Sequence, residues 1–340
     1  MLPSHFKAGG QTDADPRRLS TPLLEARKKY SKPSPPPTGL IFLTIACVLV
    51  LVFQLWVGTS STRRTNAAID GATPNQRRVL AAARRAARGG PQHEPWQFPA
   101  PHLRNLVLVA CHSVYTGLDF KHAEEQSSWF LLDYQQEVPG QIHSFVQHIQ
   151  LGVHEAAADP DALLLFSGGK TRRDAGPRAE GEGYWLVAEA AKWYGSQGVR
   201  ERAFTEDKAR DSFENLLFGL CRFYELTGHY PEFITVVGYD FKQRRFRDLH
   251  RTALRLPEEA FRYEGTPALN AAAIQGEEAT IAAFAADPYA CSAALAAKRA
   301  QRDPFAAGGY DPSRCPHMAE LLTYCGPQQY DGDLPWDGTA

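Results

Sequence analysis

Three short, predominantly apolar runs constrain the fold of this 340-residue chain more than any other feature. They are Leu106–Ala110 and Ala162–Phe166, which are uninterrupted, and Phe233–Val237, which only Thr235 interrupts. A continuous apolar run of this length is typical of a strand that is buried on both faces. Segments with helical periodicity separate the runs, notably 142–153 and 211–224. This alternation predicts an α/β fold in which a mostly parallel sheet carries helices on both faces.

The second of these helices has the clearest start signal in the chain. Asp211 precedes Glu214 by three residues, which is the spacing of a capping box. We therefore expect the helix to begin at Asp211. The weaker expectations are a helical stretch over 179–194, a short strand over 199–204, a helix ending near 254, and an Ala-rich, α-rich C-terminal extension that is helical over 271–300.

The segment Gly39–Gly58 contains no charged residue and is almost entirely apolar. About 20 apolar residues in a helix cross the ~30 Å hydrocarbon core of a bilayer, so the segment predicts one N-terminal transmembrane helix. A buried core helix is the alternative, but core helices seldom run this long without a charge. A secretory signal peptide would start nearer the terminus and end in an A-x-A-like cleavage site, which is not found here.

The orientation of this span is less constrained than its position. Lysine and arginine are equally frequent on the two sides of the segment, so the positive-inside rule does not choose between orientations. A short N-terminal tail before a first anchor favours N-in/C-out. No N-x-[ST] glycosylation sequon occurs to support a lumenal domain. We expect a single-pass protein of the endomembrane system, in the Golgi or the endoplasmic reticulum.

The distribution of charge divides the chain into unlike parts. The total of 37 Lys and Arg against 38 Asp and Glu argues against a general nucleic-acid binder. Residues 59–90 nevertheless carry seven arginines and one acid, whereas 91–340 carry a net charge of −11. Within the stem, 77–88 suits either a helix on lipid headgroups or a solvated linker helix. The expected organisation is a disordered basic tail (1–38), the transmembrane helix (39–58), a basic stem (59–100), an α/β domain (101–270) and an extension (271–340) that packs on the domain or trails from it.

Ligands of open α/β sheets bind beyond the carboxyl ends of the strands. The polar segments that follow the expected strands are 111–117, 167–172, 205–215 and 238–245. In the second of them, Ser167-Gly168-Gly169 is either a tight turn or a place where backbone N–H groups approach an anion. It is neither a Walker A loop nor a G-x-G-x-x-G fingerprint, so neither nucleotide motif is present here.

Several charged side chains in these segments are candidates for chemistry. Glu206 leaves a buried strand and is a stronger candidate than Asp211, whose simplest role is helix capping. Lys242 and Arg245 stand at a helix start, where cations oppose the helix dipole. An anionic ligand, or a carboxylate such as Glu206, would explain them. His112 is a candidate general acid–base, but not a partner of Ser113, because adjacent residues of a strand point in opposite directions.

The cysteines do not form a metal-binding pattern. No C-x-x-C or H-E-x-x-H motif occurs, and we predict no metal site. Cys111 and Cys221 lie in apolar elements, where we expect small hydrophobic roles. Cys291, Cys315 and Cys325 fall together in the extension. In an oxidising lumen, Cys315–Cys325 would be the most plausible pair, because these two are closest in sequence.

Taken in order, the strand-end segments resemble the YdcF/SanA-like family, also called domain of unknown function 218. Its pattern is a Ser-Gly-Gly turn, a Ser-Glu-Ala-type helix start, a Glu followed by a Glu-Asn helix start, and a strand end with His and Arg. The corresponding segments here are Ser167-Gly168-Gly169, Ala179-Glu180-Gly181, Glu206 with Ser212-Phe213-Glu214-Asn215, and Val237 to Arg245. The resemblance covers 103–265 and is closest to the membrane-anchored eukaryotic, especially fungal, branch.

The resemblance implies a Rossmann-like fold, a polar pocket and an enzymatic role. Carried over by position, the implied pocket residues are Ser167, Gly168, Gly169, Glu180, Glu206, Glu214, Asn215 and Arg245. This sequence departs from the family at Lys242, where relatives usually have His, and at Gly181 and Gly183, which loosen the helix start. Lys242 could replace a histidine acid–base only with a lowered pKa; otherwise its role is electrostatic.

The sequence thus predicts a hydrolase or transferase that acts on an anionic, phosphorylated or lipid-linked substrate near a membrane. The expected catalytic residues are Glu206, Glu180 and His112. The expected substrate-binding residues are Ser167, Gly168, Gly169, Arg172, Asn215, Lys242 and Arg245. A non-catalytic, membrane-anchored metabolite-binding or scaffold protein is the alternative, and a structural protein with a decayed site is a third. The sequence does not identify a cofactor.

Overall fold

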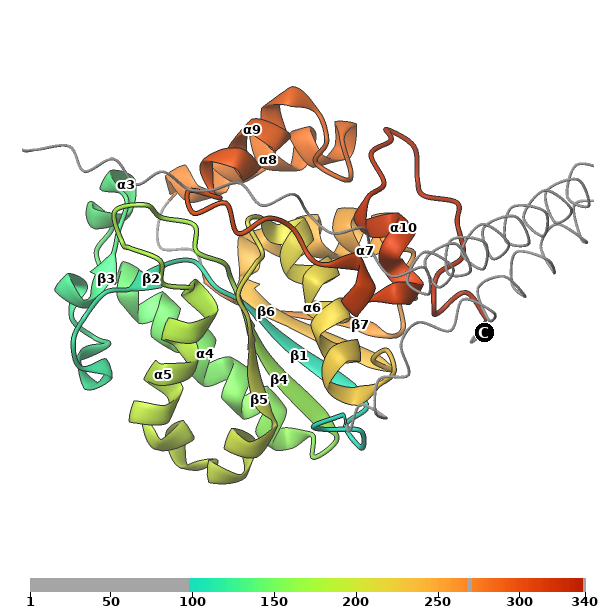
Figure 1. Cartoon of the computed structure of the whole chain (residues 1–340). Coiled ribbons are helices and arrows are strands. Elements are labelled where there is room, and N and C mark those ends of the chain that lie inside the picture. Colours follow the sequence, from blue (N-terminus) through green and yellow to red (C-terminus); the bar gives the residue numbers. More distant parts are fainter. Residues whose placement is uncertain (1–97, 268–270, 339–340) are drawn as a thin grey trace, which may run out of the picture. The chain divides into compact units, whose positions relative to one another are not determined.

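The computed structural model describes residues 98–267 and 271–338 (Figure 1). Its centre is a sheet of five strands in the order β5-β4-β1-β6-β7, and every neighbouring pair is parallel. The expected α/β fold with a mostly parallel sheet is confirmed. The strands are β1 (Asn105–Ala110), β4 (Ala162–Ser167), β5 (Ala203–Glu206), β6 (Phe233–Tyr239) and β7 (Phe261–Thr266).

Two of these strands differ from expectation. β5 begins at Ala203, because 3-10 helix precedes it up to Arg202, and the strand expected over 199–204 is therefore shifted. β7 was not expected at all. Its residues alternate between buried and exposed, as befits an edge strand, so it contains no continuous apolar run.

Helices cover both faces of the sheet and define two hydrophobic cores (Figure 1). On one face, α4 (Gln141–Ala158) packs over Val107 and Val109 of β1, and α5 (Glu180–Ala190) packs beside it over β4 and β5. On the other, α6 (Ser212–Thr227) packs over Leu106 and Leu108, and the turn that includes α7 (Arg251–Ala253) joins the same core. Because successive β1 side chains point to opposite faces, one uninterrupted apolar run supplies both cores.

The helix α6 begins where the sequence predicted. The Asp211 side chain accepts a hydrogen bond from the backbone N–H of Glu214 at 2.9 Å, as an N-cap residue does. The helix ends at Gly228, whose φ of +82° is in the left-handed region that favours glycine. The expected second half of the capping box is absent, because the Glu214 carboxylate accepts hydrogen bonds from Arg210 instead.

The glycines at the start of α5 permit close packing. A Cβ on Gly181 would lie 2.5 Å from the carbonyl oxygen of Phe166, and one on Gly183 would lie 2.8 Å from the Cβ of Tyr115. The small size of these two glycines therefore has a packing role at the helix start. It lets the first turn of α5 lie directly against β4, which brings Glu180 to the end of the sheet.

The remaining elements complete the layers around this frame. A small antiparallel pair, β2 (Val114–Tyr115) and β3 (Trp129–Phe130), and the short helix α3 (Asp133–Gln136) follow β1 in the chain and precede α4. The 3-10 helices are Phe120–His122, Gln126–Ser128, Lys192–Gly195, Gln197–Arg202, Asp240–Lys242, Pro312–Arg314 and Pro316–Met318, and Arg245–His250 forms a π-helical segment.

The C-terminal extension packs into the domain. The Ala-rich stretch forms α8 (Ala271–Ala286) and α9 (Ala293–Gln301), separated at the Asp287-Pro288 pair, and α10 (Ala319–Leu322) follows. Buried side chains of this extension join the core under α6, including Leu295, Met318 and Leu321. Of the two arrangements considered, packing on the domain is therefore the one observed.

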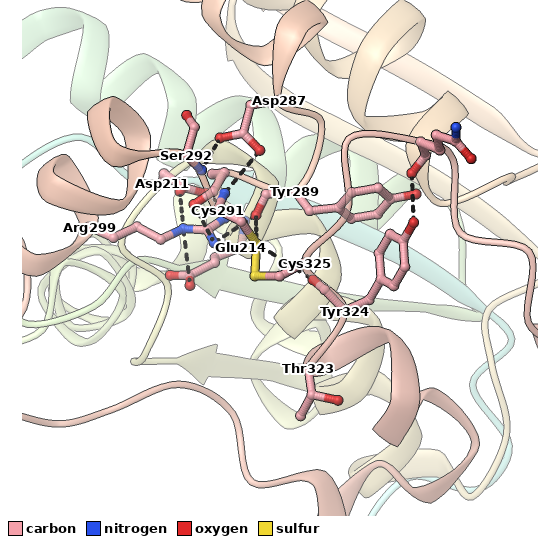
Figure 2. Close-up of a disulfide and its surroundings, with 12 residues drawn as sticks. Asp211, Glu214, Asp287, Tyr289, Cys291, Ser292, Arg299, Thr323, Tyr324 and Cys325 are labelled. Carbon is pink, nitrogen blue, oxygen red and sulfur yellow. Dashed lines mark hydrogen bonds and ion pairs between the residues drawn. A yellow bond between two sulfur atoms is a disulfide. The ribbon is translucent and has the colours of Figure 1, made fainter.

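One disulfide joins the extension to the domain and a second closes a loop within the extension, and neither is the pair favoured by sequence proximity. Cys315 pairs with Cys221 of α6, and Cys325 pairs with Cys291 (Figure 2). The expected Cys315–Cys325 pair and the purely hydrophobic role of Cys221 are thus wrong, because folding brings cysteines 94 residues apart within a Cα distance of 5.2 Å. Cys111 is free and buried, as expected.

No helix within 98–267 and 271–338 is both long and apolar enough to cross a bilayer. The predicted transmembrane segment 39–58, the basic tail and nearly all of the stem lie outside these residues.

Candidate functional site

A cavity of about 710 Å³ opens at the carboxyl ends of the strands. The chain leaves β1 toward β4 on one side and leaves β6 toward β7 on the other, so the loops after β1 and β6 diverge. Such a switch point is where open α/β sheets bind ligands. The polar and charged groups that line the cavity are His112, Thr171, Arg172, Glu180, Arg210, Asp211, Ser212, Asn215, Tyr239, Lys242, Arg245, Glu277, Thr280 and Arg302, together with Tyr134, Gln135, Glu137 and Gln141 from the α3 region.

His112 and Lys242 meet in this cavity from the two diverging loops. The Lys242 Nζ lies 3.4 Å from the His112 Nδ1, and the His112 ring stacks on Tyr239 with ring centroids 4.9 Å apart. Burial lowers the pKa of His112 well below its usual value, and the charge of Lys242 adds to this, so the imidazole is neutral at pH 7. Burial and the nearby Arg245 lower the pKa of Lys242 to about 7. The condition for Lys242 to act in acid–base chemistry is therefore met.

Arg245 finds its carboxylate partner in Glu277 of α8. The Arg245 Nε and the Glu277 Oε1 are 3.1 Å apart, and both residues are buried. Of the two explanations offered for these cations, an anionic ligand or a carboxylate such as Glu206, a carboxylate is observed for Arg245, but it is Glu277 and not Glu206. Sequence reasoning did not single out Glu277, although the Glu277-Glu278 pair is the only charge in an otherwise Ala-rich helix and could have drawn attention.

Glu180 lies at the cavity as predicted. It is the first residue of α5, and its Oε1 accepts a hydrogen bond from the Thr171 hydroxyl. Burial raises the pKa of Glu180, while the Thr171 hydrogen bond and the charge of Arg172 act in the opposite direction. A carboxyl group in this setting can exchange a proton closer to neutral pH than an exposed glutamate does.

Ser167, Glu206 and Asn215 come together, but mostly beneath the cavity. The Ser167 hydroxyl donates to the Glu206 Oε2 at 2.6 Å, and the Asn215 Nδ2 donates to the Ser167 Oγ at 2.9 Å. The other oxygen of Glu206 accepts from the backbone N–H groups of Lys208 and Ala209. Only Asn215 lines the cavity. Glu206 and Ser167 thus form a buried network that joins β4, β5 and α6, rather than a surface open to substrate.

The two glycines after Ser167 belong to the same network. The Gly168 N–H donates to the Glu206 carbonyl at 3.0 Å, and the Gly169 N–H donates to the Ala209 carbonyl at 2.8 Å. A Cβ on Gly169 would lie 2.7 Å from that second oxygen. Both amide donors are engaged within the protein, so the tight-turn interpretation describes this segment and the anion-binding interpretation does not.

Arginines supply the cationic character of the cavity instead. The half-buried Arg172 lines it, and no hydrogen bond or ion pair engages its guanidinium group among the described residues. Arg302, just after α9, also lines it and donates to the Arg210 carbonyl at 3.0 Å. Sequence reasoning missed Arg302, because nothing local links the extension to the sheet. Lys170 does not line the cavity.

Glu214, a residue carried over from the family resemblance, lies outside the cavity. Its carboxylate accepts hydrogen bonds from Arg210 and pairs with Arg299 of α9 at 3.3 Å (Figure 2). Arg299 also pairs with Asp211. These ion pairs fasten α9 to the start of α6, which is how the extension brings Arg302 to the site. No group of three or more metal-ligating side chains occurs within the described ranges.

The comparisons with known proteins assign no function to this site. No protein-family model matches the sequence, and no solved structure matches it. The chain is similar to "Uncharacterized protein YOR238W" of Saccharomyces cerevisiae, with 26% identity over an aligned length of 257 residues. That alignment covers 59% of this chain and 84% of the yeast protein.

Proposed function

We propose that this protein is a membrane-anchored, YdcF-like enzyme, a hydrolase or transferase, that acts on an anionic substrate carrying a phosphate or a lipid-linked phosphate. The observation that carries the proposal is the cavity between the loops after β1 and β6. There a lysine beside a neutral histidine, unpaired Arg172 and the buried Glu180 converge on one space of about 710 Å³.

The residues divide into two roles under this proposal. Arg172 and Arg302 bind the anionic group, since neither guanidinium is neutralised by a carboxylate in an ion pair among the described residues. Glu180 and His112 transfer protons to and from the reacting atoms, and Lys242 is the amine that lies beside His112 in the same space. Arg245 is held by Glu277 and orients the loop that carries Lys242. Ser167, Glu206 and Asn215 position the floor of the cavity.

The membrane location rests on the sequence, and the compartment draws support from the structure. The segment 39–58 would anchor the chain as a single-pass protein. Disulfides persist in oxidising compartments, and the two described here both lie in the region C-terminal to the anchor. They favour the N-in/C-out orientation with the domain in the lumen of the Golgi or endoplasmic reticulum. The Rossmann-like strand order and the strand-end motifs support the YdcF-like assignment.

The proposal is tested with the purified full chain in detergent. It is incubated with phosphomonoesters, phosphodiesters and lipid-linked diphosphates, with and without divalent cations, and product is measured by mass spectrometry. We expect Arg172→Met and Glu180→Gln to reduce turnover at least about 100-fold without unfolding the domain. The control is Lys170→Met, which removes a neighbouring charge outside the cavity. Full activity in both site variants would refute the assignment.

A binding protein without turnover is the second candidate. It is favoured by the internal pairing of several cavity charges, since Arg245 is held by Glu277 and Arg210 by Glu214. Such pairing builds a rigid binding surface. In this case, calorimetry would show saturable binding of the same compounds, weakened in Arg172→Met, while no product formed with any of them.

A further inference from the structure

The Lys242 side chain has an unusual set of neighbours for a lysine. Its Nζ contacts the His112 Nδ1 at 3.4 Å, and no carboxylate of the described residues forms an ion pair with it. Two aromatic rings lie beside the same nitrogen: the distance from the Nζ to the ring centroid is 5.3 Å for Tyr239 and 5.8 Å for Phe241. By contrast, Arg245, Arg210 and Arg299 each have a carboxylate partner.

The balance of charge around Lys242 comes from several elements. Facing it are His112 after β1, His148 of α4, Glu180 of α5, Arg245 after β6, Glu277 of α8 and Arg302 after α9. The two carboxyl groups favour the ammonium form, but burial and the two arginines outweigh them and lower the pKa of Lys242 to about 7. Burial also lowers the pKa of His148 to about 3, so this second imidazole is uncharged at pH 7.

A neutral amine in this position has a base within reach. It can donate one N–H to the His112 Nδ1, which leaves its lone pair free in the cavity. The stack on Tyr239 holds the His112 ring in place. A nucleophile hydrogen-bonded to an oriented base is the arrangement that covalent catalysis uses, and a lysine beside another cation is one way to activate it.

We propose that Lys242 is a nucleophilic amine, with His112 as its base, that forms an imine with the carbonyl group of an anionic ligand. The ligand class is an aldehyde or ketone that carries a phosphate or carboxylate, which Arg172 and Arg302 bind in the same cavity. The anionic part of this inference rests on the proposed function, whereas the nucleophile does not.

The covalent step balances without any further reactant. The Lys242 nitrogen forms a bond to the carbonyl carbon while the C=O π bond opens, and the His112 Nδ1 accepts a proton from that nitrogen. The proton then passes to the carbinolamine oxygen, the second N–H proton follows, and the oxygen leaves as water. The products are a neutral imine and one water molecule, and no electron is gained or lost overall.

Pyridoxal 5′-phosphate is a suitable probe, because it carries both an aldehyde and a phosphate. The full chain in detergent is incubated with it at pH 7.5, and the imine is trapped with sodium cyanoborohydride and located by peptide mass spectrometry. The neutral fraction of an amine with a pKa near 7 exceeds that of an ordinary lysine several hundred-fold, on the order of 10²–10³. We expect Lys242 to be labelled at least about tenfold faster than the exposed Lys298, which is the internal control.

Two variants separate the parts of the site. His112→Phe keeps a ring against Tyr239 but removes the base, and it is expected to slow Lys242 labelling at least about tenfold. The double variant Arg172→Met/Arg302→Met is expected to raise the half-saturating probe concentration at least about tenfold, and inorganic phosphate is expected to protect Lys242 in the wild type. Circular dichroism establishes that each variant is folded.

The outcomes distinguish the inference from the proposed function. Labelling of Lys242 no faster than Lys298, with phosphate binding still measured by calorimetry, would overturn the nucleophile and leave the anion site standing. Fast labelling that neither phosphate nor the arginine variants affect would overturn the anionic ligand class, together with the anion site of the proposed function. Fast labelling that phosphate and both sets of variants suppress supports the whole inference.

Discussion

Replacing Glu206 by glutamine should alter how the stability of the domain depends on pH. Glu206 is only 2% exposed, and its carboxylate accepts hydrogen bonds from Ser167 and from two backbone N–H groups. These bonds favour the charged form, but desolvation by burial is larger and raises the pKa from 4.5 to about 7. The folded protein therefore binds this proton more tightly than the unfolded chain does.

The sign and size of the effect follow from that difference. Below pH 4.5, Glu206 is protonated in both states and makes no pH-dependent contribution. Between pH 4.5 and 7 the folded state retains a proton that the unfolded state has lost, so the free energy of unfolding falls as the pH rises. At about 1.4 kcal/mol per pKa unit, the loss above pH 7 is about 3 kcal/mol. The Glu206→Gln variant has no titrating group at this position, so its free energy of unfolding does not show this decrease with pH.

The glutamine variant also has a pH-independent cost, which must be separated from the slope. Its amide oxygen can accept from the same backbone N–H groups, but its NH₂ faces Ser167, whose hydroxyl hydrogen then loses its acceptor. An unsatisfied buried donor costs about 1–3 kcal/mol at every pH. The informative quantity is therefore the difference in free energy of unfolding between variant and wild type, measured as a function of pH.

The assay is urea denaturation of the full chain in detergent from pH 4.5 to 8, followed by the fluorescence of the buried Trp129 and Trp193. The difference between Glu206→Gln and the wild type should move in favour of the variant by about 3 kcal/mol across this range. Glu258→Gln, with a side chain 77% exposed, is the matched control. Equal pH slopes for wild type and Glu206→Gln would refute the assignment of a buried, proton-retaining carboxyl.

Two further substitutions test the packing around the site. Glu277→Gln should destabilise the domain by about 3–5 kcal/mol, because it leaves the buried Arg245 charge without its partner. The double variant Arg245→Met/Glu277→Leu should recover most of the lost melting temperature. A lower melting temperature in the double variant than in Glu277→Gln would contradict the ion-pair argument. Gly181→Ala should lower the free energy of unfolding by about 1–3 kcal/mol, since its Cβ would lie 2.5 Å from a β4 carbonyl oxygen. Gly198→Ala, where the Cβ meets open space, is the control, and equal chemical-denaturation midpoints for the two would contradict the close-approach argument.

Elements whose signal lies within a few residues were predictable from the sequence. The strands β1, β4 and β6 contain the three predominantly apolar runs, because a strand buried on both faces favours apolar side chains at successive positions. The start of α6 at Asp211 followed from a capping interaction that spans three residues. The edge strand β7 escaped notice, because its exposed face dilutes the apolar pattern.

The site was predictable in location but not in composition. Parallel strands with crossover helices place all strand ends on one edge, so His112, Glu180 and Lys242 were expected near one another, and they do line one cavity. The sequence could not tell which strand-end residues face the cavity and which form hydrogen bonds beneath it. Ser167 and Glu206 form a hydrogen bond beneath it, because the last residues of β4 and β5 are neighbours in the sheet.

By itself, the sequence determined the parallel α/β sheet, the edge at which its polar residues gather and the N-terminal cap of α6, because each depends on residues that are close together in the chain. Only the tertiary structure decided that Glu277 pairs with Arg245, that Arg302 reaches the cavity and that Cys221 bonds to Cys315. These contacts join segments far apart in the chain, and no short-range pattern encodes which distant side chains will share a buried space. Burial in that shared space is also what lowers the pKa of Lys242, turning an ordinary surface charge into a candidate reactive amine.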